Sequence, residues 1–181
     1  MYSLEGKLTF LAMERTASRA VRDAFIIAGA KQVADHHDGP DQGHEIVGVP
    51  FTVVRNHWDY IVSHWYNAKM NEKSNEPITN RWLCYHFMSN RYWYRPGSIF
   101  RFLEVPNIHV LRHETLQDDL DDLFMAHDLD PVKLEMEGES EERQGRHYRG
   151  FYNAASAGFV AWCFRPEIEK LGYRFEGPPG Y

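Results

Sequence analysis

Short apolar runs, each followed by a polar loop and then by a segment with helical periodicity, constrain the fold of this chain most strongly. Lys7–Met13 and Phe51–Val54 are predicted to be buried strands, because both are short apolar runs and the second is rich in β-branched residues. The segments after them, 18–30 and 58–70, space their apolar residues three or four apart and are predicted to be helices. The alternation predicts a three-layer α/β fold with a central parallel sheet flanked by helices.

The rest of the chain continues this alternation without an internal repeat or a low-complexity tract. Ser18 is expected to cap the first helix, and Gly29 lies near its end. The length of 181 residues fits a single domain over residues 1–181, with a core large enough to fold without disulfides. Further strands are predicted at 31–36 and 108–111, a loop at 38–43, and further helices at 79–88, 116–126 and 154–164, with another turn from Pro166.

Charge and cysteine usage exclude several classes of protein. The chain has 20 Lys and Arg residues against 26 Asp and Glu residues, and its net charge of −6 excludes a globally basic nucleic-acid-binding protein. It has neither an apolar run of the roughly 18–20 residues that span a bilayer nor the features of a signal peptide. Cys84 and Cys163 lie far apart and outside any CxxC motif, which indicates neither a disulfide framework nor a zinc site. We expect a soluble protein with neither nucleic acid nor membrane as partner.

The first strand–loop–helix junction, Glu14–Arg19, has the composition of a phosphate-binding loop. It combines backbone N–H groups at a helix start with the hydroxyls of Thr16 and Ser18 and the guanidiniums of Arg15 and Arg19. A hydroxyl-capped helix with solvated arginines is the alternative interpretation. In a parallel sheet, ligands collect where such loops leave the carboxyl ends of the strands.

The second junction begins at Arg55, which ends the strand at 51–54. Ser63 lies eight residues later, about two turns into the following helix, and could return its hydroxyl toward an anion that Arg55 faces. A planar guanidinium fork and a neutral hydroxyl donor are suited to sharing one phosphate.

The second junction, FTVVRNHWDYIVSHWYNAK, resembles the 3′-phosphate-binding segment of sulfotransferases that use 3′-phosphoadenosine 5′-phosphosulfate (PAPS) as sulfate donor. That family's pattern is a strand, then Arg-Asn-Pro-x-Asp, then a Ser eight residues after the Arg. Arg55, Asn56, Asp59 and Ser63 match it.

Three other segments resemble the same family, in the family's order. MERTASRA is similar to its 5′-phosphosulfate loop, VLRHETL at 110–116 to its strand–Arg–x–Glu–x–Leu stretch, and the segment 146–175 to its closing segment, which ends in Gly-Tyr-x-Phe. The resemblance therefore spans most of the chain. It implies a P-loop NTPase-like fold and a sulfotransferase, with PAPS as co-substrate, 3′-phosphoadenosine 5′-phosphate (PAP) as product, and no required metal.

The resemblance also assigns the residues of the donor site. The segment Arg15, Thr16, Ala17, Ser18 and Arg19 would hold the 5′-phosphosulfate, Arg55 and Ser63 would hold the 3′-phosphate, and Arg146, in a Gly-Arg-x-Tyr stretch, would contact the nucleotide.

The chain departs from the family pattern at three positions. Arg15 replaces the usual lysine and, because it stays protonated, would act electrostatically on the departing phosphate. Ala17 replaces the usual glycine, which predicts a negative φ there, and His57 replaces the usual proline.

A general base would have to take the proton of the acceptor, and histidine suits this role because its pKa is near neutral. In the family the base lies on a loop between the two phosphate segments, where this chain has His36, His37, His44 and Glu45. We favour His37, followed by His36, because they end the strand predicted at 31–36. A metal site at 35–38 is the alternative, although four adjacent ligands rarely close one coordination geometry.

The resemblance implies that the acceptor is a hydroxyl or amine on a small molecule or glycan, and the aromatic stretch at 92–94 could line its cleft. The sequence names neither the acceptor nor the oligomeric state, and a cytoplasmic enzyme of bacterial or viral type is expected. Two alternatives remain: a non-catalytic PAP(S)-binding module, and a P-loop nucleotide or nucleoside kinase. The chain lacks the kinase motif G-x-x-x-x-G-K-S/T.

Overall fold

A computed structural model describes residues 1–36, 38–72, 78–81, 83–84, 96–135 and 147–175. By its contacts the chain divides into two compact units. The first contains Met1–Arg55 and Phe100–Glu137, and the second contains Asn56–Ile99 and Gly138–Tyr181.

The first unit is built on a five-stranded mixed sheet with strand order β3-β1-β2-β4-β5. β2 runs parallel to β4, and β4 runs parallel to β5, whereas β1 is antiparallel to both β2 and β3. The prediction of a parallel sheet is therefore confirmed for β2, β4 and β5 and wrong for β1. The strands are β1 (Tyr2–Leu4), β2 (Leu8–Phe10), β3 (Lys31–Gln32), β4 (Val49–Val54) and β5 (His109–Arg112).

Strand β1 was not predicted because it is only three residues long and has no periodicity of its own. It exists because a tight turn at Glu5 and Gly6, both with positive φ (51° and 68°), folds it back against β2. Glycine adopts this left-handed conformation without the steric cost that other residues meet.

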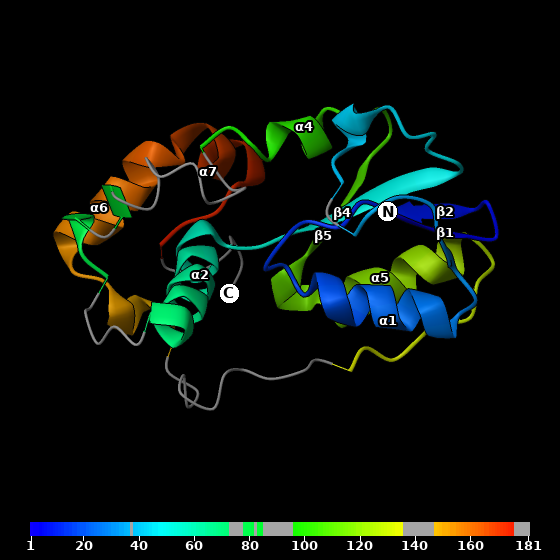
Figure 1. Ribbon diagram of the computed structural model, residues 1–181, viewed down its shortest axis with the longest axis horizontal. Helices are drawn as coiled ribbons and strands as arrows, with labels where there is room; N and C mark the ends of the chain where they lie inside the picture. Colours follow the sequence, from blue (N-terminus) through cyan, green and yellow to red (C-terminus); the bar gives the residue numbers. More distant parts are fainter. Residues whose placement is uncertain (37, 73–77, 82, 85–95, 136–146, 176–181) are drawn as a thin grey trace. The chain divides into compact units, whose positions relative to one another are not determined.

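Helices α1 (Ser18–Ile27) and α5 (Leu116–Ala126) cover one face of this sheet (Figure 1). Their apolar stripes close a core in which aromatic rings pack against one another in tilted and edge-on arrangements. The ring centroids of Phe25 and Phe51 are 5.3 Å apart, and those of Phe25 and Phe124 are 5.6 Å apart. The helices predicted at 18–30 and 116–126 are confirmed in type and in approximate extent.

Two short elements lie on the side of the sheet opposite α1 and α5 (Figure 1). The 3-10 turn η1 (Pro40–Gln42) and helix α4 (Phe100–Leu103) are in contact, and the Arg101 guanidinium lies 3.6 Å from the Asp41 carboxylate. A further 3-10 turn, η2 (His113–Thr115), joins β5 to α5.

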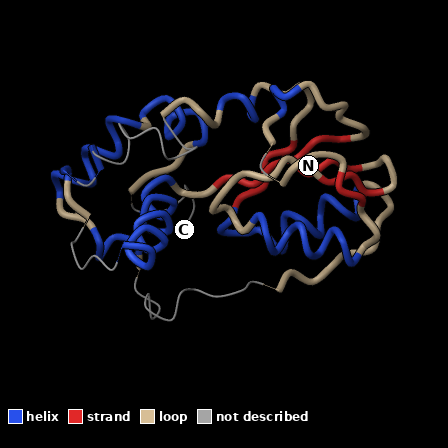
Figure 2. Tube along the Cα trace, in the orientation of Figure 1, coloured by secondary structure: helices blue, strands red, loops and turns tan. Residues whose placement is uncertain are grey.

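The register of the sheet fixes which loops share an edge. Tyr2 pairs with both Phe10 and Gln32, and Phe10 pairs with Phe51, so these residues form one row across the sheet. Because β3 and β2 are both antiparallel to β1, they run in the same direction. The loops after β2 and β3 and the end of β4 therefore leave the same edge (Figure 2). This is the edge at which the two phosphate-binding loops are predicted from the sequence.

The second unit contains α2 (His57–Glu72), the 3-10 turn η3 (Tyr148–Phe151), α6 (Ala154–Cys163) and α7 (Arg165–Leu171). Helix α6 begins with a capping box in which Asn153 and Ser156 exchange side-chain and backbone hydrogen bonds. The helices predicted at 58–70 and 154–164 are confirmed. Of the helix predicted at 79–88, residues 80–81 and 83–84 are helical, and residues 82 and 85–88 lie outside the described residues. Among the described helices, none is long and apolar enough to cross a bilayer.

Candidate anion-binding site

The loop between β2 and α1 holds two non-glycine residues in the left-handed region. The turn Glu14–Ala17 has φ 59° at Arg15 and φ 62°, ψ 24° at Ala17. The prediction of a negative φ at Ala17 is therefore wrong, because the loop keeps the glycine-like backbone although its side chain is alanine. Each such residue costs roughly 1–2 kcal/mol, and non-glycine left-handed residues concentrate at functional sites.

The backbone conformation at the start of α1 is of a kind that binds anions through N–H groups. Ala17 is left-handed and Ser18 is the first helical residue, and such an alternation forms a concave nest of N–H groups. Ala17, and not Ser18 as predicted, occupies the N-cap position of α1, where no side chain makes a capping hydrogen bond. The first turn of α1 also contains no acidic residue, so the positive end of the helix dipole meets no carboxylate within the helix.

The predicted hydroxyl ligands are both buried. Thr16 is fully buried and its Oγ1 donates to the carbonyl oxygen of Met13 at 2.9 Å, which closes the turn. Ser18 is 6% exposed. Thr16 therefore has a structural role in the loop, and an anion here would meet mainly backbone N–H groups and the two arginines. Arg19 is exposed and Arg15 is half-buried.

Arg55 joins the second junction to the first. It follows β4 directly, and its Nη1 donates to the carbonyl oxygen of Arg15 at 3.2 Å. Two further hydrogen bonds hold β4 against the strand-to-loop transition after β2: Thr52 Oγ1 donates to Leu11 O at 2.9 Å, and Leu11 N donates to Phe51 O at 2.9 Å. The structure thus brings together Arg15 and Arg55, two predicted site residues that lie forty positions apart in the sequence.

Of the two remaining predicted nucleotide contacts, Ser63 and Arg146, the structure describes Ser63. Ser63 lies on α2 in the second unit and is partly exposed. Arg146, the preferred base His37 and the aromatic stretch at 92–94 lie outside the described residues.

His36 is described, and it lies on the β3 loop that leaves the carboxyl edge. Its ring makes an edge contact with Tyr2 at 5.5 Å, and both of its ring nitrogens are buried. It also lies within electrostatic reach of α1. The pKa of Asp23 on that helix is lowered mainly by a hydrogen bond from Arg22, and the charge of His36 lowers it further. His36 is thus near the first helix, but its nitrogens are shielded from solvent.

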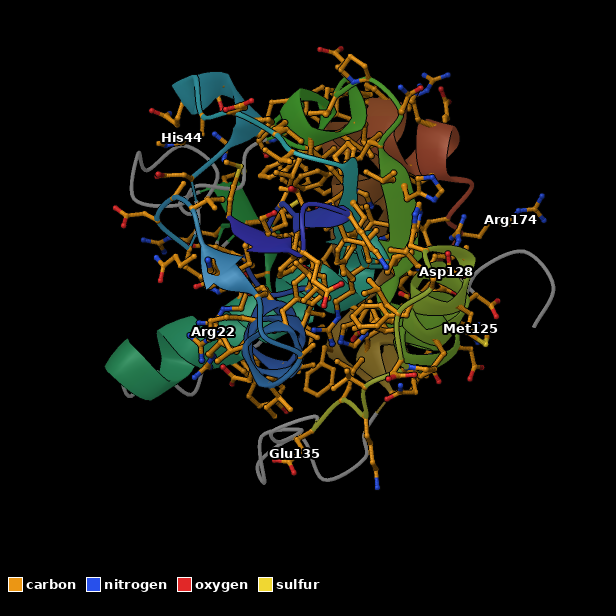
Figure 3. The ribbon with its side chains drawn as sticks, turned by 90° about the vertical axis from the view of Figure 1, so that its right-hand side faces the viewer. Arg22, His44, Met125, Asp128, Glu135 and Arg174 are labelled. Carbon is orange, nitrogen blue, oxygen red and sulfur yellow. The ribbon has the colours of Figure 1, made fainter. Side chains whose placement is uncertain are left out.

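His44, another histidine considered as the base, forms a pair with a carboxylate. Its Nε2 lies 3.0 Å from Asp38 Oδ2, which also accepts a hydrogen bond from the Asp35 backbone N–H at 3.1 Å. Figure 3 shows His44 on the opposite side of the sheet from Arg22 of α1. Among the described residues, no group of three or more His, Cys, Asp or Glu side chains could hold a metal ion.

In the second unit, Asn56 of the matched motif has a role that sequence reasoning missed. Its Nδ2 donates to the carbonyl oxygen of Arg174 at 3.1 Å and lies 3.5 Å from the Tyr148 hydroxyl. Its Oδ1 accepts from the backbone N–H of Trp58 at 3.1 Å, within the first turn of α2. The motif asparagine therefore ties the start of this helix to the closing segment of the chain.

Phe175 is the centre of an aromatic cluster in the same unit. Its ring lies 5.5 to 5.9 Å from those of Trp58, Tyr148 and Tyr152. Tyr148 donates to the Phe175 carbonyl at 2.5 Å, and Tyr152 donates to the Trp58 carbonyl at 2.8 Å. Burial raises the pKa of both phenols, which keeps them protonated as hydrogen-bond donors. The aromatic residues of the closing segment signalled this cluster in the sequence.

Comparison with protein-family models, with curated protein sequences and with solved structures finds no match to this chain.

Proposed function

We propose that this protein is a PAPS-dependent sulfotransferase on a P-loop NTPase-like fold. The observation that carries the proposal is the bond between Arg55 and Arg15 at the carboxyl edge of the sheet. It joins the two segments that, by their resemblance to sulfotransferases, would hold the 3′-phosphate and the 5′-phosphosulfate of one nucleotide. The left-handed turn before an uncapped helix adds support, because it suits an anion without requiring a metal.

In the proposed site, the 5′-phosphosulfate lies against the backbone N–H groups of Thr16, Ala17 and Ser18, with Arg15 and Arg19 supplying positive charge. Arg55 holds the 3′-phosphate. The resemblance adds Ser63 and Arg146 as further contacts to the nucleotide, and these two assignments stay predictions.

The proposed reaction is transfer of a sulfuryl group. An acceptor oxygen or nitrogen attacks the sulfur, the bond from sulfur to the bridging phosphate oxygen breaks, and the electron pair stays on the phosphate of PAP. Arg15 would stabilise that charge electrostatically. The acceptor proton goes to a histidine of the 36–44 loop, with His37 and then His36 as the preferred base.

Two other functions predict different ligands. A kinase would bind ATP with Mg²⁺, and a non-catalytic module would bind PAP without turning over PAPS. The absence of the kinase loop motif from the sequence disfavours the first. The replacement of the usual lysine by Arg15 is the observation that favours the non-catalytic module.

Calorimetric titration with PAP, ADP and ATP–Mg²⁺ tests the proposal. We expect PAP to bind at least tenfold more tightly than ADP and the Arg55→Ala variant to lose this preference. Arg22→Ala is the matched control, because Arg22 lies on α1 and bonds the neighbouring Asp23 at 2.7 Å. Equal affinities for PAP and ADP in the wild-type protein would refute the proposed function.

A further inference from the structure

We propose that Arg55 also positions the 5′-phosphosulfate loop, so that one guanidinium couples the two ends of the nucleotide site. This inference rests on the proposed function for the identity of the ligand. The structural relationship itself, a hydrogen bond from Arg55 Nη1 to Arg15 O at 3.2 Å, lies wholly within the first unit.

The loop needs an external restraint because its backbone is unfavourable. Arg15 and Ala17 both have φ near 60°, a conformation that an arginine or an alanine rarely adopts alone. Within the loop, Thr16 closes the turn through its bond to Met13. Arg55, which directly follows β4, adds a hydrogen bond from another part of the sheet. The acceptor of this bond is the carbonyl oxygen of Arg15, which is itself one of the left-handed residues. Removing Arg55 would free the peptide group after Arg15 to rotate.

The chemistry of arginine permits both roles at once. A guanidinium carries several N–H donors in a rigid planar fork, and the bond to Arg15 uses one of them. In the proposed site, the same fork faces the 3′-phosphate while this bond is kept. A lysine would supply the charge without the fork, so it would recover affinity for the 3′-phosphate better than it would recover the loop.

This coupling predicts that Arg55 affects a ligand that it does not touch. Adenosine 5′-phosphosulfate carries the 5′ group of PAPS but lacks the 3′-phosphate. If Arg55 served only the 3′-phosphate, the Arg55→Ala variant would bind adenosine 5′-phosphosulfate as well as the wild type does. If Arg55 also holds the loop, the affinity of the variant for adenosine 5′-phosphosulfate falls. The expected decrease is roughly tenfold, because a hydrogen bond from a charged donor is lost.

The experiment combines calorimetry with hydrogen exchange on wild type, Arg55→Ala, Arg55→Lys and the control Arg22→Ala. For Arg55→Ala we expect weaker binding of adenosine 5′-phosphosulfate and faster exchange of the amides at 16–18 in the ligand-free protein. Arg55→Lys should show the same faster exchange with a smaller loss of PAP affinity, and Arg22→Ala should change neither measurement.

The outcomes separate this inference from the proposed function. Unchanged exchange at 16–18 in Arg55→Ala, or affinity for adenosine 5′-phosphosulfate within twofold of the wild type, would overturn the positioning role even if PAP is selected over ADP. Faster exchange at 16–18 together with equal wild-type affinities for PAP and ADP would support the loop restraint and refute the nucleotide assignment. Thermal unfolding of each variant shows that the altered protein is still folded.

Discussion

Asn56 Nδ2 donates a hydrogen bond to the carbonyl oxygen of Arg174 at 3.1 Å, across 118 positions of sequence. The same side chain accepts from Trp58 N at 3.1 Å, so one buried amide both starts α2 and fastens the closing segment. A residue that the sequence associates with nucleotide binding therefore has a direct part in holding the second unit together.

Replacing Asn56 by alanine should lower the free energy of unfolding by about 1–3 kcal/mol, because the buried N–H of Trp58 and the carbonyl oxygen of Arg174 both lose their hydrogen-bond partner. Urea unfolding of the variant measures this loss. The control is Asn80→Ala, at an exposed position of the same unit, which should change the free energy by no more than about 0.5 kcal/mol. Equal effects of the two substitutions would contradict the role assigned to Asn56.

Ala17→Gly should stabilise the protein by about 1 kcal/mol. Ala17 has φ 62°, where glycine avoids the steric cost of the Cβ atom, although glycine also raises the entropy of the unfolded chain. Ala20→Gly, three residues later within α1, is the opposite case and should destabilise the protein by about 1 kcal/mol. Urea midpoints that fall for both variants would show that φ at Ala17 is not positive in solution.

His57 should make the protein sensitive to acid. Its ring is fully buried, 5.3 Å from that of Phe164 and 6.2 Å from that of Tyr173, and burial lowers its pKa to about 3. The unfolded chain takes up a proton near pH 6.5, whereas the folded protein does so only near pH 3. With respect to His57, the free energy of unfolding is therefore at its full value above pH 6.5 and decreases as the pH falls from 6.5 toward 3.

The change between pH 7 and pH 5 should be about 2 kcal/mol from this residue, since one pKa unit corresponds to about 1.4 kcal/mol. Urea unfolding at the two pH values measures it. His57→Phe should remove this part of the pH dependence, and His109→Gln, at an exposed position on β5, should retain it. A wild-type slope that survives in His57→Phe would assign the acid sensitivity to other groups.

The base should be identified by a loss of turnover without a loss of nucleotide binding. Alanine variants of His36, His37 and His44 should all bind PAP like the wild type, because none of them is assigned to the nucleotide. Turnover is measured as PAP released from PAPS in the presence of a panel of phenols and sugars. We expect His37→Ala to lose at least about a hundredfold in rate.

Activity that survives His36→Ala, His37→Ala and their combination would show that the preferred base is wrong. Loss of turnover in His44→Ala alone would assign the general-base role to His44, whose Nε2 lies 3.0 Å from Asp38 Oδ2. Loss of PAP affinity in one of these variants would instead indicate that its histidine belongs to the nucleotide site.

The positions of most helices and strands followed from local patterns in the sequence. The apolar stripes of 18–30 and 116–126 and the β-branched run at 51–54 have the periods of a helix and a strand, and the structure contains α1, α5 and β4 there. Hydrophobic periodicity predicts these elements because it depends only on whether one face or both faces of the helix or strand are buried. Strand β1 escaped detection, since three residues carry no usable period and its conformation depends on pairing with β2 and β3.

The sequence by itself determined which chemistry is present at the two junctions: two arginines and two hydroxyls in one loop, and an arginine at the end of a buried strand. Only the tertiary structure decided how these groups are used. Thr16 is turned inward to Met13, and Arg55 reaches the Arg15 carbonyl across the sheet edge. Ala17 keeps a left-handed backbone against its own preference. A local pattern sets the propensity of each residue, but hydrogen-bond partners and backbone strain are fixed by packing between segments that lie far apart in the chain.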